Sequence, residues 1–158
     1  MRRQLAIASD HAGFGLKEEA KSFLTTLDID VTDMGTNDTA SVDYPDLGCK
    51  VAHGVSCGVF PMGILICGSG IGMSIVANKF PNIRAALCLD EWTAEMCRKH
   101  NNANILVLAG RRTTSQQMKQ IIKAWLFTEF EGGRHQQRLD KIKQIEEKYQ
   151  KGTDVCPN

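Results

Sequence analysis

The feature that most limits what this chain can fold into is a regular alternation of short apolar runs with segments of helical periodicity. The apolar runs predict strands over residues 5–9, 30–34, 63–67, 84–89 and 105–109. The intervening periodicity predicts helices over 16–27, 46–55, 73–79, 92–100 and 115–127. Parallel strands need crossover connections, and those are right-handed. The alternation therefore predicts an α/β fold in which a five-stranded parallel sheet lies between two layers of helices.

Length and composition narrow the class of protein. With 158 residues the chain suits one domain, residues 1–158, in which 131–150 form a C-terminal arm and helix. Its net charge of +1 gives no support to a nucleic-acid or membrane-surface role. The apolar run after Arg2 and Arg3 is too short for a signal peptide, and no run matches a membrane span, so we expect a cytoplasmic protein. The six cysteines show neither C-x-x-C nor zinc spacing, which favours reduced thiols.

The segment from Ile64 to Ser74 carries the strongest functional signal. An apolar run ends at Cys67, and glycines follow at 68, 70 and 72 before a helix. Glycines let a backbone approach a ligand closely, and a helix N-terminus favours anions and oxyanions. The same field favours a thiolate, so Cys67 is a candidate base or nucleophile. The alternative is a small, buried, purely structural cysteine.

Two familiar glycine-loop functions fail on spacing. A dinucleotide fingerprint needs a third glycine where Met73 stands. A cysteine phosphatase needs an arginine in the loop to hold phosphoryl oxygens, and none occurs between Cys67 and Asn78.

Other polar residues are expected at the same edge of the sheet, since ligands of such sheets bind beyond the carboxyl ends of the strands. Asp10 and His11 follow the first strand, and Arg111 follows the fifth. Tyr44 and Pro45 begin the second helix, with Asp43 as its expected cap.

Further along the chain lie more candidate groups. Arg134 and Arg138, four residues apart, share a helix face. Together with Arg111 they suit a phosphate, although each alone is by default a solvated surface residue. His100 is either a helix-end partner of the dipole or an acid–base group. With Ser69 and a thiolate, this set suits proton abstraction next to a carbonyl, which needs no metal or redox cofactor.

An additional helix is expected over residues 139–150. It carries an apolar stripe that the sheet does not require, formed by Leu139, Ile142, Ile145 and Tyr149. The stripe favours docking of this helix on a partner subunit, and the alternative is that it folds back on its own domain.

Several motifs together resemble ribose-5-phosphate isomerase type B, in a sugar-phosphate isomerase family that also includes allose- and galactose-6-phosphate isomerases. They occur in order at residues 9–13, 43–46, 67–74, 77–79, 100–101 and 132–135. The resemblance implies a Rossmann-like fold and a homodimer or dimer of dimers with shared active sites. It also implies an enzyme of the pentose phosphate pathway that interconverts ribose 5-phosphate and ribulose 5-phosphate through a cis-enediolate, without a cofactor.

The resemblance also implies roles for individual residues. Cys67 would be the base, Ser69 would assist transfer at the oxygens, and His100 would open the furanose ring. Other residues would contact the sugar (Asp10, Tyr44), stabilise the enediolate (Asn101 and the amides of Gly68, Gly70, Ile71 and Gly72) or hold the phosphate (His11, Arg111, Arg134, Arg138). A second branch of the family uses a glutamate as base where this chain has Met73, which cannot accept a proton.

Three alternatives remain open at this stage. The first is an isomerase of a six-carbon sugar phosphate, allose or galactose 6-phosphate. The second is a non-catalytic nucleotide- or flavin-binding module, which the missing fingerprint disfavours. The third is a thiol redox protein, which the missing C-x-x-C partner disfavours.

Overall fold

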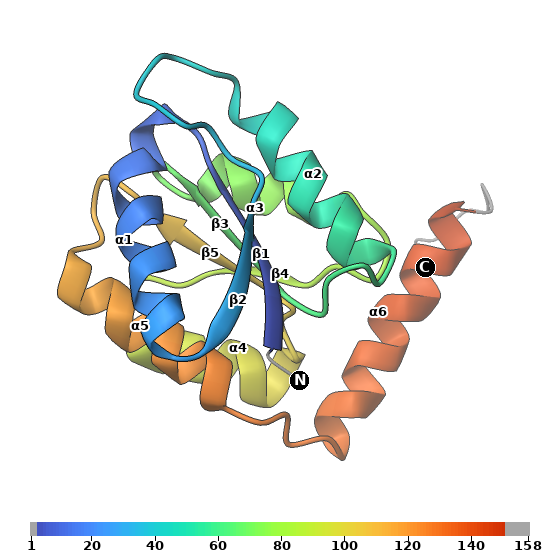
Figure 1. Ribbon diagram of the computed structural model, residues 1–158. Coiled ribbons are helices and arrows are strands. Elements are labelled where there is room, and N and C mark those ends of the chain that lie inside the picture. Colours follow the sequence, from blue (N-terminus) through green and yellow to red (C-terminus); the bar gives the residue numbers. More distant parts are fainter. Residues whose placement is uncertain (1–2, 151–158) are drawn as a thin grey trace.

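The computed structural model describes residues 3–150, which contain one sheet of five strands (Figure 1). The strands are β1 (Arg3–Ser9), β2 (Ile29–Asp33), β3 (Gly63–Cys67), β4 (Ala85–Leu87) and β5 (Ile105–Ala109). They lie in the order β2-β1-β3-β5-β4, and all pairs are parallel. The predicted α/β fold is confirmed. Residues 1–2 and 151–158, including Cys156, lie outside the described part, so a single domain over 1–158 stays a prediction.

Helices cover both faces of this sheet (Figure 1). On one face lie α1 (Phe14–Thr26), α4 (Glu91–Asn101) and α5 (Ser115–Phe127). On the other lie α2 (Tyr44–Ser56) and α3 (Ile71–Ala77). Along β3, Ile64 and Ile66 face the first layer, whereas Leu65 and Cys67 face the second. Because side chains alternate across a strand, the position of Cys67 sends its thiol toward α2 and α3.

The element bounds agree with the predictions best at the centre of the sheet. β3, β5 and α5 have the predicted residues. The strand predicted over 84–89 is shorter at both ends. The Arg84 N–H donates to the Asn104 side chain at 2.8 Å, and beyond Cys88 the chain leaves the sheet to reach Asp90, the N-cap of α4. Asp43 is the N-cap residue of α2, as expected, but its side chain makes no capping hydrogen bond.

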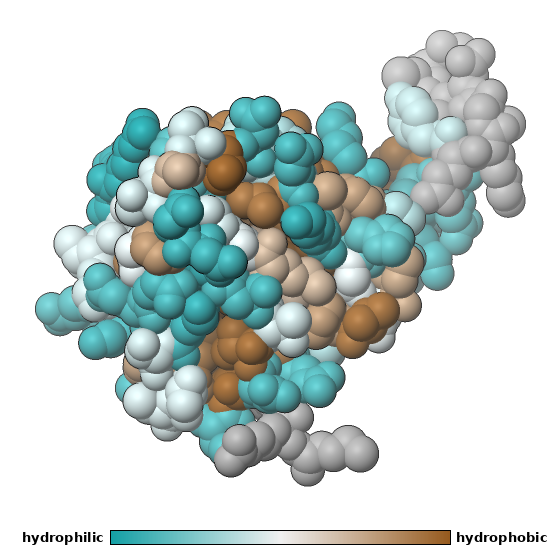
Figure 2. Space-filling model, turned by 45° about the horizontal axis from the view of Figure 1, so that its top comes forward, coloured by the Kyte–Doolittle hydropathy of each residue, from teal (hydrophilic) through white to brown (hydrophobic). Residues whose placement is uncertain are grey.

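The last helix, α6 (Arg134–Gln150), stands apart from the two layers (Figures 1 and 2). It starts earlier than predicted, directly after Gly132 and Gly133, whose positive φ angles of 66° and 53° turn the chain into it. Leu139 is buried against the same chain, and the Glu146 carboxylate accepts from Asn82 N at 3.0 Å. The rest of the apolar stripe is half or more exposed, at Ile142, Ile145 and Tyr149. The helix thus folds back in part, and docking on a partner stays a prediction.

None of the helices in residues 3–150 has both the length and the apolar character that crossing a lipid bilayer requires. On the face that Figure 2 shows, apolar residues are interspersed with polar ones.

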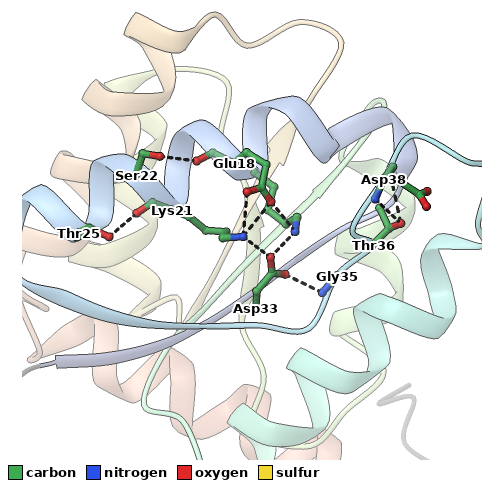
Figure 3. Close-up of polar contacts among 9 residues, drawn as sticks. Glu18, Lys21, Ser22, Thr25, Asp33, Gly35, Thr36 and Asp38 are labelled. Carbon is green, nitrogen blue, oxygen red and sulfur yellow. Dashed lines mark hydrogen bonds and ion pairs between the residues drawn. The ribbon is translucent and has the colours of Figure 1, made fainter.

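A partly buried ion-pair cluster joins α1 to the end of β2 (Figure 3). Lys17 is fully buried and pairs with Asp33 and, at 3.0 Å, with Glu18. Lys21 reaches the same Asp33 carboxylate at 2.7 Å, and Gly35 N donates to it at 2.9 Å. Burial opposes the charge of Asp33, but the hydrogen bonds from both lysines and Gly35 outweigh it, so its pKa is lowered. The cluster fixes the chain just before the loop that leads to Tyr44.

We expect Asp33→Asn to destabilise the fold by about 3 kcal/mol at neutral pH, because it leaves the buried Lys17 ammonium short of one charge partner. Since the folded pKa of Asp33 is lowered, the stabilisation is full above the unfolded pKa and is lost as the pH falls through the folded value, below about 4. Urea unfolding at several pH values, with the exposed Asp30→Asn as control, measures this. Equal loss in both variants would contradict it.

Candidate active site

The glycine loop begins where β3 ends, at the carboxyl edge of the sheet. Gly70 has a φ of 76°, and a Cβ there would lie 2.4 Å from Leu87 Cδ1, so glycine is required. Ser69 Oγ accepts from Ile71 N at 3.3 Å, at the start of α3. The loop therefore has a defined shape, and its backbone leads directly into the N-terminus of a helix.

Cys67 lies at the expected place, the last residue of β3, but its side chain does not stand open in the single chain. It is 4% exposed and belongs to the apolar cluster with Ala8, Leu65 and Met73. Its carbonyl oxygen accepts from Gly110 N at 2.8 Å. The thiol is thus shielded from water directly below the glycine loop.

Asp10 and His11 lie beside this loop, and both make structural contacts. Asp10 Oδ1 accepts from Ala12 N at 3.0 Å and from Gly13 N at 3.1 Å, which caps a short 3-10 helix, His11–Gly13. His11 Nδ1 accepts from Val42 N at 3.2 Å. A neutral His11 ring therefore carries its proton on Nε2, which leaves that N–H to donate to a ligand.

Tyr44 covers the loop from the start of α2. A Cβ on Gly72 would lie 2.5 Å from Tyr44 Cζ and 2.8 Å from its hydroxyl oxygen. The absence of a side chain at residue 72 therefore lets the phenol ring rest on the first turn of α3. Tyr44 is 37% exposed, so this residue is accessible to a ligand.

Arg111 approaches the loop from the end of β5. Its backbone N–H donates to the Gly68 carbonyl at 3.1 Å. Its guanidinium lies against the same glycine, since a Cβ on Gly68 would be 3.4 Å from Arg111 Nε. We call Asp10, His11, Tyr44, Arg111 and residues 67–72 the carboxyl-edge group, which the structure brings together as predicted.

His100, Asn101, Arg134 and Arg138 do not join this group within one chain. α4 begins at the carboxyl edge, with Asp90 as its N-cap, and runs antiparallel to the strands, so its end lies at the opposite edge. Its eleven residues span about 16 Å. α6 starts beside that end (Figure 1). Within a single chain, His100 therefore does not face Cys67. We call these four residues, with Glu131 and His135, the amino-edge group.

His135 is a member of this group that sequence reasoning left out of the site, although its motif, residues 132–135, was noticed. Its ring stacks on His100, with centroids 4.3 Å apart and planes 8° apart. His135 is 4% exposed, and its Nε2 lies 3.5 Å from a Glu131 carboxylate oxygen. Burial, followed by the nearby charges of His100 and Arg134, lowers the pKa of His135. The lowered pKa favours the neutral form of the His135 ring, which stacks on the His100 ring.

Three residues of the amino-edge group carry side chains that can ligate a metal ion. His100, Glu131 and His135 each offer a ligand atom, and these atoms lie within 4.8 Å of one another. A metal ion binds in the plane of an imidazole ring, and the two ring planes are parallel and stacked. One ring would have to turn before both could bind one ion, so the observed arrangement fits stacking better than coordination.

We expect Gly72→Ala to displace the Tyr44 ring with little effect on stability. For the sugar-phosphate isomerisation that the resemblance implies, kcat/KM should fall by about 10-fold, through a higher KM. The ring atoms that the new methyl group meets form the far end of a side chain that can move aside. Steady-state kinetics and a urea melt measure this, with Gly15→Ala, which meets no atom within 4 Å, as control. Unchanged kinetics would mean that the position of Tyr44 does not matter for substrate.

Comparison with known proteins shows which family this chain is similar to. The model of the Ribose/Galactose Isomerase family matches residues 5–142. Ribose-5-phosphate isomerase B of Escherichia coli (strain K12) is 42% identical over 146 residues, which are 92% of this chain and 98% of that protein.

Two solved structures are also similar. Ribose-5-phosphate isomerase B of Clostridium thermocellum superposes with a TM-score of 0.91 at 49% identity, over 92% of this chain and 99% of that one. The enzyme of Mycoplasma genitalium, solved with bound ribulose-5-phosphate, gives 0.89 at 42% identity, over 93% and 98%. A family match across nearly the whole chain, together with near-identical folds, shows that this chain belongs to the ribose/galactose isomerase family.

Proposed function

We propose that this chain is an aldose–ketose isomerase that interconverts ribose 5-phosphate and ribulose 5-phosphate. This chain matches nearly the whole length of relatives that are named for this activity, and one of them was solved with bound ribulose-5-phosphate. The observation that carries the proposal is the carboxyl-edge group, in which Cys67, the glycine loop and Arg111 lie together.

The reaction needs a base that moves one proton between two neighbouring carbons. The Cys67 thiolate takes the proton from C2 of the open-chain aldose, and that electron pair forms a C1–C2 double bond. The negative charge moves to the oxygens, where the N–H groups of residues 68–72 stabilise it. Cys67 then returns the proton to C1, and Ser69 assists proton transfer between the oxygens. The low exposure of Cys67 keeps bulk water from the sulfur, which limits side reactions of the enediolate.

The phosphate is held by groups that surround the far end of the sugar. His11 offers its Nε2–H, and Arg111 offers a planar fork beside Gly68. Asp10 and Tyr44 contact the sugar between the phosphate and the loop.

The amino-edge group is supplied, in this proposal, by a second copy of the chain. His100 opens the furanose ring, Asn101 stabilises the enediolate, and Arg134 and Arg138 complete the phosphate site. The distance between the two edges supports this, since one chain cannot bring His100 to its own Cys67. The exposed stripe on α6 supports it too, because docking on a partner would cover it.

Turnover of sugar phosphates by the purified full-length chain tests the proposal. We expect ribose 5-phosphate to be isomerised with a higher kcat/KM than allose 6-phosphate or galactose 6-phosphate. The six-carbon alternative is kept because the family description includes galactose. Preference for a six-carbon substrate would move the proposal to that branch, and absence of any isomerisation would overturn it.

We place the enzyme in the cytoplasm and in the pentose phosphate pathway.

A further inference from the structure

Two thiols outside the candidate active site lie close enough to react with each other. Cys88 directly follows β4, and Cys97 lies in the middle of α4. Their sulfur atoms are 3.7 Å apart, and their side chains are 1% and 8% exposed. Both belong to the core on the α1, α4 and α5 face, whereas Cys67 belongs to the core on the other face. No spacing pattern in the sequence indicates this pair, because eight residues separate the two cysteines.

The two thiols are not equivalent. The Cys88 thiol donates its hydrogen to Cys97 Sγ. This hydrogen bond, helped by the charge of Arg98, outweighs burial and lowers the pKa of Cys97. The same hydrogen bond, with burial, raises the pKa of Cys88. Cys97 is therefore the better nucleophile, and Cys88 is placed as its resolving thiol.

In the single chain, a cavity gives small molecules access to Cys97. It has a volume of about 260 Å³ and lies between α4, β4 and α6, where Cys97, Ala86, Asn101, Leu139 and Ile142 are among its lining residues. Cys88 does not line it. A water molecule occupies about 30 Å³, so an oxidant as small as hydrogen peroxide fits and meets Cys97 first.

We propose that Cys88 and Cys97 form an oxidation site, which hydrogen peroxide converts into an intrachain disulfide. The Cys97 thiolate attacks one peroxide oxygen, the O–O bond breaks, and a sulfenic acid forms on Cys97 as one water leaves. Cys88 then attacks that sulfur, the S–O bond breaks, and a second water leaves as the S–S bond forms. Two thiols are oxidised by two electrons and the peroxide is reduced by two. The sulfur atoms must approach from 3.7 Å to about 2.0 Å, and the new bond ties the edge strand β4 to α4.

Peptide mass spectrometry on the full-length protein tests this directly. Trypsin cleaves after Arg84 and Arg98, so both cysteines lie on one peptide, residues 85–98. After treatment with equimolar hydrogen peroxide and then an alkylating reagent, we expect this peptide to have lost two hydrogens and to carry no alkyl group. A thiol reductant should restore uptake of two alkyl groups. Exposed Cys57 is the internal control and should remain fully alkylated.

Variants separate the two steps. In Cys88→Ala we expect a sulfenic acid on Cys97 that a dimedone probe traps, and in Cys97→Ala we expect Cys88 to stay reduced. Cys67→Ala should form the disulfide as the wild type does, so the result does not depend on the proposed isomerase function. If peptide 85–98 of the wild type takes up two alkyl groups after Cys57 has been oxidised, the proposal is wrong. Oxidation of Cys88 in Cys97→Ala, at the wild-type rate, would also overturn it.

Discussion

Replacing Cys67 by alanine should lower kcat for ribose 5-phosphate by about 10²- to 10⁴-fold, because the isomerisation loses its general base. The thiol lies in an apolar cluster that a methyl group can also fill, so we expect the fold to persist. KM should change little, since phosphate binding is assigned to other side chains. Initial rates at several substrate concentrations measure kcat and KM, and isothermal titration calorimetry measures substrate binding to the variant.

The matched control for this variant is Cys57→Ala, at an exposed thiol on the C-cap of α2. It should keep wild-type turnover. Near wild-type turnover of Cys67→Ala would show that the thiol is only a structural cysteine, which is the alternative that the sequence left open.

A mixture of two inactive variants should regain activity if the active sites are shared. In a two-fold dimer of Cys67→Ala with His100→Ala, one site carries both substitutions and the other carries neither. Random pairing of equal amounts makes half of the dimers hybrids, so we expect about a quarter of wild-type activity. Mixing by unfolding and refolding, followed by an assay with ribose 5-phosphate, measures this.

The controls for this experiment are each variant refolded alone and a mixture of Cys67→Ala with Cys67→Ala/His100→Ala. None of them contains an intact pair, so all should stay inactive. If the mixture of the two single variants also stays inactive although hybrids form, then Cys67 and His100 do not act in a shared site.

Local sequence patterns were enough to predict the elements and their order. Burial on both faces makes β3 and β5 continuous apolar runs, so their bounds were read without error. The strand predicted over 84–89 exceeds β4 at both ends, because the Arg84 N–H is bound by Asn104, twenty residues away, and the chain turns toward the N-cap of α4 at Asp90. The Lys17–Asp33 pair was not foreseen for the same reason, since the two residues meet only where α1 packs beside β2.

The identity of the candidate residues also came from the sequence, but their grouping did not. Strand ends and glycine positions placed Cys67 and Arg111 at one edge, since all parallel strands end there. The sequence likewise placed His100 at the end of a helix, but the direction of that helix takes the side chain to the far edge. The stack of His100 on His135 depends on how α6 meets α4, which no local pattern encodes.

The chain alone therefore determined the α/β order, the loop after Cys67 and the set of polar residues, because hydrophobic periodicity and glycine placement act over a few residues. Only the tertiary structure decided which residues meet, how far the thiol is shielded and that Cys88 lies against Cys97. The physical reason is that these contacts depend on strand order and helix direction, and those follow from the packing of the whole core.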